Sequence, residues 1–502
     1  MNKSSSLSSF ALLSLLWENE NRDYLDMICQ FVLKSMPIQI GSLINIDNIA
    51  CKMKEDYGFT NIPRQVIEKA LVRLSKSKRT RPCYVRKENR QYVVIERFDS
   101  SKFDSNYAEM NRKINEVLSS LIHFLHNQRM LKDVNEEIAS KILFNFFESY
   151  GLTVVGDTEK LRSITISNGE HNYYVARFII RILEKEPIIL QSLIDITKGF
   201  LIFKAVYYYS TTNIKSDIAS KLRGTEFYID CSLVIDALGY DSESDELAFD
   251  EMCQLIKSNG GRVCVFEHTI EEASNLLEIY ARKQYERNAF SFLGLEARKY
   301  PQEVLYTIAQ PQTITENLAK KQITIFPVPS YTPSDEKKNK YLGFQDEQKI
   351  EEQLKSYHKQ IMLSNSRVNF DTISLSAIGR LRKDSHPTRI ENCSAIMVTQ
   401  DWRLCQCMRD LYPAYFPPEI DFAIHDIDLV SLLWVGQENA QSHLPRSILI
   451  SYAFAACEIN QEIMDKAIEL TKKMELDNTI PKEAALIIRS QTAIKSILAD
   501  IT

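Results

Sequence analysis

In the second half of the chain, two apolar segments are each followed by an acidic residue. Asp230 follows residues 227–229, and Asp401 follows residues 396–398 by way of a short turn that contains Thr399. Both apolar segments have the length and composition of buried strands. An acid at the end of a buried strand costs free energy unless a metal, a substrate or a hydrogen-bond network uses it. Both acids are therefore candidates for chemistry.

Two further acidic positions lie near the starts of expected helices. Glu271 and Glu272 fall in the first turn of a helix predicted over residues 269–280. Asp371 stands directly before the apolar helical segment 372–378, where it would serve as the N-cap. Each of these acids on its own is more simply explained as a turn residue, a first-turn helix acid or a cap. A site is suggested because all four acids, Asp230, Glu272, Asp371 and Asp401, occur in this order along the chain.

The four positions would meet if the strands of this section run in parallel, because ligands collect at the carboxyl edge of such a sheet. Converging carboxylates cannot all ionise without a counter-charge. Mg²⁺ or Mn²⁺ bound through oxygen ligands would supply that charge.

The elements that must position these acids lie in residues 223–436, where strands alternate with helices. Such alternation predicts a parallel sheet with helices on both faces. Residues 281–367 break the alternation and predict a mostly helical insertion placed to cover or narrow the carboxyl edge. The segments expected as strands are 227–229, 262–266, 396–398 and 422–424, with a further candidate at 323–326.

Residues 223–436 resemble the PIN-like nuclease family, whose domain is a three-layer α/β fold. The matching pieces are an acid after the first strand, a Glu in the helix after the second, an Asp that opens a later helix, and the turn Thr399-Gln400-Asp401. The resemblance implies a nuclease that uses Mg²⁺ or Mn²⁺. It makes Asp230, Glu272, Asp371 and Asp401 the metal ligands and catalytic residues. Thr399 would orient a carboxylate, and Ser232 and Glu271 would support the site.

The sequence departs from compact members of that family at two points. Cys231-Ser232 replaces the pair that more commonly follows the first acid, and a long segment separates Glu272 from Asp371. The buried stripe on its helix favours Glu272 over its neighbours as the second acid. Whether Glu271 or Glu272 binds the metal stays open.

Residues 20–98 have the order of expected helices and strands that is typical of a winged helix. Three amphipathic helices are expected over residues 23–36, 46–57 and 63–77, and alternating segments at 83–86 and 91–95 predict a β-hairpin as the wing. Gly58 follows the second helix as a stop signal.

The third helix and the wing are strongly basic. Residues 64–90 contain ten Lys and Arg against two Glu, a net charge of +8 within a chain of net charge −5. Cations placed there would contact the phosphates of RNA or DNA. The alternatives are a protein–protein adaptor and a solvated basic face. The candidate nucleic-acid-binding residues are Arg64, Lys69, Arg73, Lys76, Arg79 and Arg86, with Arg403 at the acidic site.

The remaining segments are predicted to be helical, so the chain as a whole is mostly α. Residues 1–19 are expected to be an N-terminal tail, 99–222 a helical connecting domain, and 437–502 a C-terminal helical tail. The most apolar long segment, 188–209, is interrupted by charged residues and predicts a buried helix rather than a membrane span. The N-terminus lacks the cleavage site of a signal peptide, and the scattered cysteines are typical of a reduced, cytoplasmic protein.

The sequence therefore predicts a cytoplasmic, metal-dependent nuclease, a phosphodiester hydrolase that a winged helix brings to RNA or DNA. A microbial, antiviral defence or toxin-like role would suit it, with a protein partner or a homo-oligomer formed through the helical regions. The alternative is an inactive PIN-like and winged-helix protein that acts as a nucleic-acid-binding or regulatory scaffold. A phosphatase with Asp230 as nucleophile is disfavoured, because the turn lacks the second Asp that would act as acid.

Overall fold

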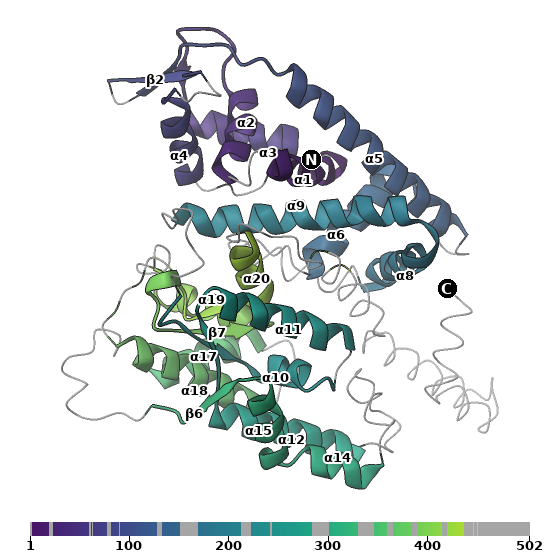
Figure 1. Cartoon of the computed structure of the whole chain (residues 1–502), viewed down its shortest axis with the longest axis vertical. Coiled ribbons are helices and arrows are strands. Elements are labelled where there is room, and N and C mark those ends of the chain that lie inside the picture. The colour runs from purple at the N-terminus through teal and green to yellow at the C-terminus, as the bar shows by residue number, and fades with distance from the viewer. Residues whose placement is uncertain are drawn as a thin grey trace. The chain divides into compact units, whose positions relative to one another are not determined.

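The chain forms two compact units, and each is described here by itself. Unit 1 comprises Met1–Ile214 with Gln437–Cys457, and unit 2 comprises Lys215–Gly436 with Glu458–Thr502. Figure 1 shows the computed structural model. It describes residues 3–19, 24–59, 62, 64–77, 82–89, 91–127, 133–150, 169–211, 222–240, 243–283, 301–329, 346–358, 365–383, 385, 387, 390–413, 419–435, 445 and 449.

Unit 1 begins with a buried helix where a tail was expected. Helix α1 spans Lys3–Asn19, and most of its described leucines and serines are buried, including Leu12 and Ser9. A tail leading into a helix was expected over residues 1–19, but the described residues 3–19 are helical throughout, so the expected tail was wrong for them. No charged residue lies between Lys3 and Glu18, so every face of the helix can leave water. Helix α1 packs along α9 (Pro187–Thr211) and also contacts α5 (Ser101–His126).

Helices α1 and α9 approach each other so closely that one position requires glycine. A Cβ on Gly199 of α9 would fall on the backbone carbonyl of Phe10 in α1. Phe10 also packs against Phe200 and Phe203, with ring centroids 5.9 and 5.7 Å away. The backbone contact leaves no flexible side chain that could give way.

Replacing Gly199 with Ala is expected to destabilise unit 1. Helix propensity alone would favour Ala by about 1 kcal/mol, but overpacking against a backbone atom costs about 1–3 kcal/mol. We expect a net loss of up to about 2 kcal/mol in urea unfolding followed by circular dichroism. Gly224→Ala is the control, since a Cβ there would meet nothing within 4 Å. A stabilised Gly199→Ala protein would contradict the close packing of α1 on α9.

The predicted β-hairpin is confirmed. Strands β2 (Val85–Glu88) and β3 (Gln91–Val94) pair antiparallel, and β1 (Leu43–Ile44) joins the other edge of β3 in a three-stranded sheet. Gly58 ends α3 in the left-handed conformation at φ 71°, as the stop signal predicted. The helices that precede the hairpin are α2 (Tyr24–Ser35), α3 (Ile46–Tyr57) and α4 (Arg64–Leu74).

Unit 1 contains the predicted domain 20–98 and residues 99–214 of the predicted connecting domain 99–222. Its other helices among the described residues are α5, α6 (Glu136–Tyr150), α8 (Gly169–Lys185) and α9. Within the described part of the chain, no helix is both long enough and apolar enough to cross a membrane. A strand-like segment expected near residues 161–166 lies outside the described residues, as do the helices expected in the tail beyond residue 449.

Unit 2 contains the predicted parallel sheet. Five strands lie in the order β6-β5-β4-β7-β8, and every neighbouring pair is parallel. Strand β5 has the bounds that the sequence predicted, β4 and β6 differ from the prediction by one residue at one end, and β7 and β8 differ by one residue at each end. The strands are β4 (Glu226–Ile229), β5 (Arg262–Phe266), β6 (Thr324–Phe326), β7 (Ala395–Thr399) and β8 (Ala423–His425).

Helices cover the sheet of unit 2 on two sides (Figure 1). Helices α17 (Glu347–His358), α18 (Asn365–Arg382) and α19 (Trp402–Leu411) share one apolar core with the strands. Helices α11 (Glu243–Ser258) and α20 (Asp426–Val435) pack on each other and on other parts of the sheet. The short helix α10 (Cys231–Ala237) follows β4, and α12 (Glu267–Lys283) follows β5.

The expected insertion, residues 281–367, is partly built into the core. Strand β6 extends the sheet, and Ile350 and Leu354 of α17 are fully buried in the core. Two more helices of this segment, α14 (Gln302–Ile308) and α15 (Pro311–Lys320), pack against α12. The segment is therefore a continuation of the α/β layers over much of its described length.

Candidate functional site

Asp230 lies directly after the central strand β4 and caps helix α10. Its Oδ1 accepts hydrogen bonds from the backbone N–H of Leu233 at 3.0 Å and from the hydroxyl of Ser232 at 2.7 Å. Its Oδ2 accepts a hydrogen bond from the hydroxyl of Thr399. Burial raises the pKa of Asp230 despite these donors, and the nearby charge of Asp401 adds to the rise. The carboxylate is thus held in a fixed orientation at an electrostatic cost.

Asp401 follows strand β7 and caps helix α19, as the sequence predicted. Thr399 links it to Asp230, because the Thr399 oxygen accepts the backbone N–H of Asp401 at 2.9 Å. The guanidinium of Arg403 donates to both carboxylate oxygens, from Nε at 2.7 Å and Nη2 at 2.6 Å. Burial acts to raise the pKa of Asp401, but Arg403 outweighs it and lowers that pKa. Asp401 is therefore ionised near neutral pH.

Glu272 and Asp371 approach from two helices, α12 and α18. Both were predicted at helix starts, and that part of the prediction was wrong: α12 begins at Glu267 and α18 at Asn365. Strand β5 runs into α12 without a turn, and residues 365–369, all polar except Val368, carry no clear signal for the first turn of α18. The two acids therefore lie inside their helices, yet near the ends that face the carboxyl edge of the sheet.

The carboxyl groups of Glu272 and Asp371 repel each other. Burial raises the pKa of Glu272 to about 7, with Asp230 adding to the rise. Burial also raises the pKa of Asp371 well above its ordinary value, and the charge of Glu272 is the next cause. Among the described residues, no hydrogen-bond donor reaches either group. A proton or a cation is thus strongly favoured at this pair.

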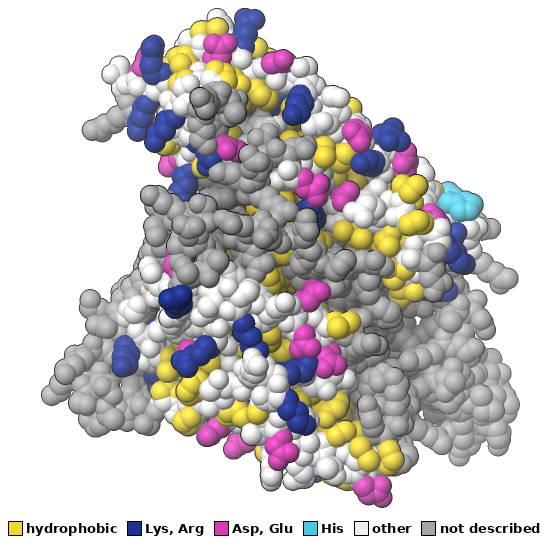
Figure 2. Space-filling model, viewed as in Figure 1, with side chains coloured by type: hydrophobic (Ala, Val, Ile, Leu, Met, Phe, Trp, Pro, Cys, Tyr) yellow, Lys and Arg dark blue, Asp and Glu magenta, His cyan; other side chains and the backbone are white. Residues whose placement is uncertain are grey.

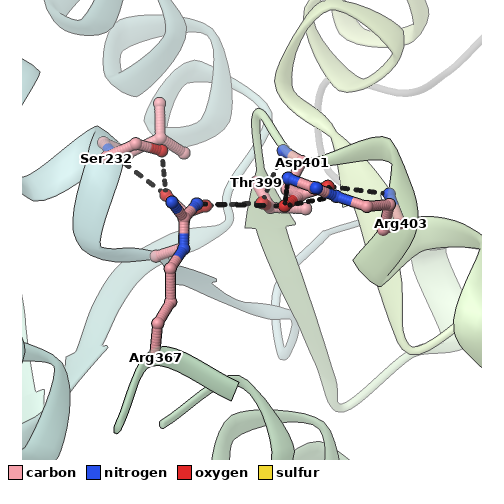
Figure 3. A network of polar contacts seen from close by, with 7 residues as sticks. Ser232, Arg367, Thr399, Asp401 and Arg403 are labelled. Carbon is pink, nitrogen blue, oxygen red and sulfur yellow. Dashed lines mark hydrogen bonds and ion pairs between the residues drawn. The ribbon is translucent and has the colours of Figure 1, made fainter. Parts of the chain in front are cut away.

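Arg367 enters the cluster from α18, one turn before Asp371. Its Nη2 lies 3.8 Å from Oδ2 of Asp401. Its positive charge acts on Asp371, Asp401, Glu272 and Asp230, which together raise the pKa of the guanidinium although burial opposes the rise. Figure 3 shows Arg367 extending from α18 toward Ser232 and Thr399, with Arg403 and Asp401 beyond. Sequence reasoning missed this residue; its spacing of four from Asp371 was the available signal.

The neighbouring acids of α12 do not join the cluster. Glu271 and Glu267 are exposed to solvent, whereas Glu272 is partly buried and interacts with Asp230 and Arg367. The structure therefore places Glu272, rather than Glu271, with the other three carboxyl groups. Glu271 was expected to support the site, but its side chain is exposed to solvent rather than buried with the other carboxyl groups.

A buried histidine joins the two helices that carry Glu272 and Asp371. Nε2 of His268 lies 2.8 Å from the hydroxyl of Ser374, across the interface between α12 and α18. Its ring stacks on Phe266 and Phe370, with centroids 5.4 and 6.2 Å away. Burial lowers the pKa of His268 to about 4, so the ring is neutral near pH 7. This contact fixes the spacing of the two helices, and nothing in the sequence pattern had pointed to it.

The donor chemistry of the cluster suits a hard divalent cation, since four carboxyl groups supply oxygen ligands and two of them accept no described hydrogen bond. The arrangement in place is held by arginines instead. Over the described ranges, no three His, Cys, Asp or Glu side chains are grouped so that they could hold a metal ion. The carboxylate ligands are therefore of the type that a divalent metal prefers, while in this structure Arg367 and Arg403 supply the positive charge near them.

The basic face of unit 1 is interspersed with acids. Figure 2 shows Lys and Arg side chains over the end of unit 1 that carries α4 and β2, with acidic side chains among them. Arg64 pairs with Asp47 at 3.1 Å, and Arg73 pairs with Asp26 at 2.7 Å. The Arg73 pair is largely shielded and ties α4 to α2.

The other candidate cations of this face differ in their surroundings. Arg86 pairs with Glu88 at 2.6 Å within the wing. Lys69 lies on α4, and Lys76 follows α4 as an exposed residue. Arg79 lies outside the described residues. At the acidic site, Arg403 is engaged by Asp401, so its side chain is not free for a phosphate in this state.

Comparisons with protein-family models, with curated proteins and with solved structures found no match for this chain. The chemistry open to the molecule is therefore inferred from the carboxylate cluster at the edge of the sheet in unit 2 and from the basic face of unit 1.

Proposed function

We propose that unit 2 is a metal-dependent nuclease that hydrolyses phosphodiester bonds in RNA or DNA. The observation that carries this proposal is the electrostatic interaction among four carboxyl groups, carried by four different elements, at the carboxyl edge of a parallel sheet. The raised pKa values of Asp230, Glu272 and Asp371 and the like charges of the four groups favour a divalent cation. The arrangement supports the resemblance to PIN-like nucleases at Asp230, Glu272, Asp371 and Asp401.

These four residues would hold Mg²⁺ or Mn²⁺, which supplies Lewis-acid activation of water and of the phosphate. Asp230 is pre-oriented by Ser232, Leu233 and Thr399, so little reorganisation is needed. Arg403 keeps the last of the four, Asp401, ionised. These contacts set the geometry of the two strand-end carboxylates.

Glu272 is the residue best suited to move a proton. Its pKa is raised to about 7, near the pH at which a general base works most efficiently. In the metal-free protein it can bind and release a proton near neutral pH. Glu271, beside it, is exposed and is not among the causes of any shift in the cluster. The proposal therefore assigns proton transfer to Glu272.

The direct test is cleavage of labelled single-stranded and double-stranded RNA and DNA by the full chain, with Mn²⁺ or with EDTA. We expect cutting of at least one substrate with Mn²⁺ and none with EDTA. Absence of cutting on all four substrates at every metal concentration would refute a nuclease. Equal cutting in EDTA would refute the role of a metal.

The hairpin and α4 of unit 1 are proposed to bind the phosphates of the substrate in the manner of a winged helix. Lys76 and Lys87 are exposed, and the Lys87 ammonium lies 5.7 Å from the Tyr92 ring centroid. Arg73 is a poor test, because its partner Asp26 makes it part of the packing of α4 on α2.

The double change Lys76→Glu and Lys87→Glu is expected to weaken nucleic-acid binding. Loss of two phosphate contacts lowers the slope of log K against log salt by about 1–2. Fluorescence anisotropy over a salt series measures both quantities. The matched control is Lys102→Glu with Lys141→Glu, which reverses two exposed charges on α5 and α6. If both double variants bind like the parent, the basic face is not the binding surface.

A second function is favoured by a separate observation. Arg367 and Arg403 already supply positive charge to the carboxylates, as expected of a regulatory or scaffold protein with an inactive site. Such a protein would bind nucleic acid in EDTA and lose binding in the Lys76 and Lys87 variant. It would not cut any of the four substrates.

A further inference from the structure

Arg367 is held in the carboxylate cluster by charge rather than by hydrogen bonds. Its nearest described contact is the ion pair with Asp401 at 3.8 Å, beyond hydrogen-bond length. Over the described residues, no hydrogen bond to its guanidinium is made. Arg403 is the opposite case, with donors at 2.6–3.0 Å from the same carboxylate. One arginine is fixed and the other is loosely held.

The position of Arg367 also leaves it room to move. Its side chain is 43% exposed, whereas that of Asp401 is 7% exposed. A long side chain near the first turn of α18 can turn its charged end into water at low cost. The guanidinium therefore stands between the carboxylates and solvent.

The charge of Arg367 stabilises the two carboxyl groups that lack described donors. It acts against the rise in pKa of both Glu272 and Asp371. Asp401 is already neutralised by Arg403 through both of its oxygens. Arg367 thus does for Glu272 and Asp371 what a bound cation would do.

We propose that Arg367 is the resident cation of this site and that a divalent metal ion must displace it. The guanidinium and the ion compete for the same carboxylates, so Arg367 turns outward when the ion binds. The charge of Arg367 then offsets part of the repulsion among the acids before metal arrives, and Arg367 sets the metal concentration at which the site fills. This inference rests on the metal site proposed above.

The test is Mn²⁺ binding by isothermal titration calorimetry on the full chain, for the parent and for Arg367→Gln. Removing one positive charge from beside the ligands is expected to lower the Kd for Mn²⁺ by about tenfold or more. The metal-free melting temperature of Arg367→Gln should fall, and Mn²⁺ should raise it by more than it raises that of the parent.

Two further variants separate charge from packing. Arg367→Lys keeps the charge and should leave the Kd within about threefold of the parent. Arg262→Gln removes an exposed arginine that pairs with Glu226 near the amino end of the sheet, and should leave the Kd unchanged. A tenfold gain in either of these variants would overturn a role for the charge of Arg367.

The remaining outcomes distinguish this inference from the proposed function. If the parent binds Mn²⁺ and Arg367→Gln binds it equally or more weakly, the competition is refuted and the metal site stands. If neither protein binds Mn²⁺ at any concentration tested, the metal site itself is refuted, and the competition with it.

Discussion

Replacing Asp230 with Asn is expected to lower Mn²⁺-dependent cleavage by about 10²–10⁴-fold. The amide keeps an oxygen that can accept the hydrogen bonds from Leu233 and Ser232, so the cap of α10 survives. What is lost is the negative charge at the centre of the cluster and the acceptor for the Thr399 hydroxyl. Single-turnover cleavage with enzyme in excess measures the effect on the chemical step.

Glu271→Gln is the matched control for that experiment. Glu271 lies beside Glu272 in sequence but is exposed, and we expect its variant to cleave at the parental rate. Urea unfolding of Asp230→Asn should show that unit 2 remains folded. If Asp230→Asn cleaves like the parent, or if Glu271→Gln loses as much activity, the cluster is not the active site.

Replacing Glu272 with Gln is expected to stabilise the metal-free protein at pH 8. In the folded chain the pKa of Glu272 is raised from 4.5 to about 7. The folded state therefore binds a proton more tightly than the unfolded state does. That contribution to stability is fully present below about pH 4.5 and is lost as the pH rises through about 7. Above that range the ionised carboxyl destabilises the fold.

The expected gain for Glu272→Gln at pH 8 is about 2 kcal/mol, because each unit of pKa shift corresponds to about 1.4 kcal/mol and the group is partly solvated. Near pH 4.5 the variant and the parent should be equally stable. Urea unfolding in EDTA at the two pH values checks both statements. An equal difference at both pH values would show that packing, rather than charge, sets the effect.

The strands and the strand-end acids could be predicted because each depends on local sequence. Asp230 and Asp401 follow apolar segments of strand length, and the registers of β4 with β7 and β5 bring those ends into line. Glu272 and Asp371 interact electrostatically with Asp230, as their expected convergence implies, although their positions within the helices were predicted wrongly. The sequence shows no turn or cap at the start of either helix, so the first residues of α12 and α18 could not be predicted. The edge of the sheet that the two acids approach could be predicted.

Arg367 and His268 could not be predicted, because their roles depend on contacts between segments far apart in the chain. Nε2 of His268 meets the hydroxyl of Ser374 across two helices, and Arg367 reaches a carboxylate on a different strand. Helix α1 was missed for a related reason. Serines such as Ser9 indicate a tail in sequence, yet small side chains are what allow a neighbouring helix to pack closely.

Crystals of the full chain soaked in Mn²⁺ and measured near the manganese absorption edge test the central claim most directly. The predicted result is an anomalous peak bounded by carboxylate oxygens of Asp230, Glu272, Asp371 and Asp401, with Arg367 turned toward solvent. The contradicting result is a site without a peak, in which Arg367 still lies beside Asp401 and the four carboxyl groups keep their metal-free positions.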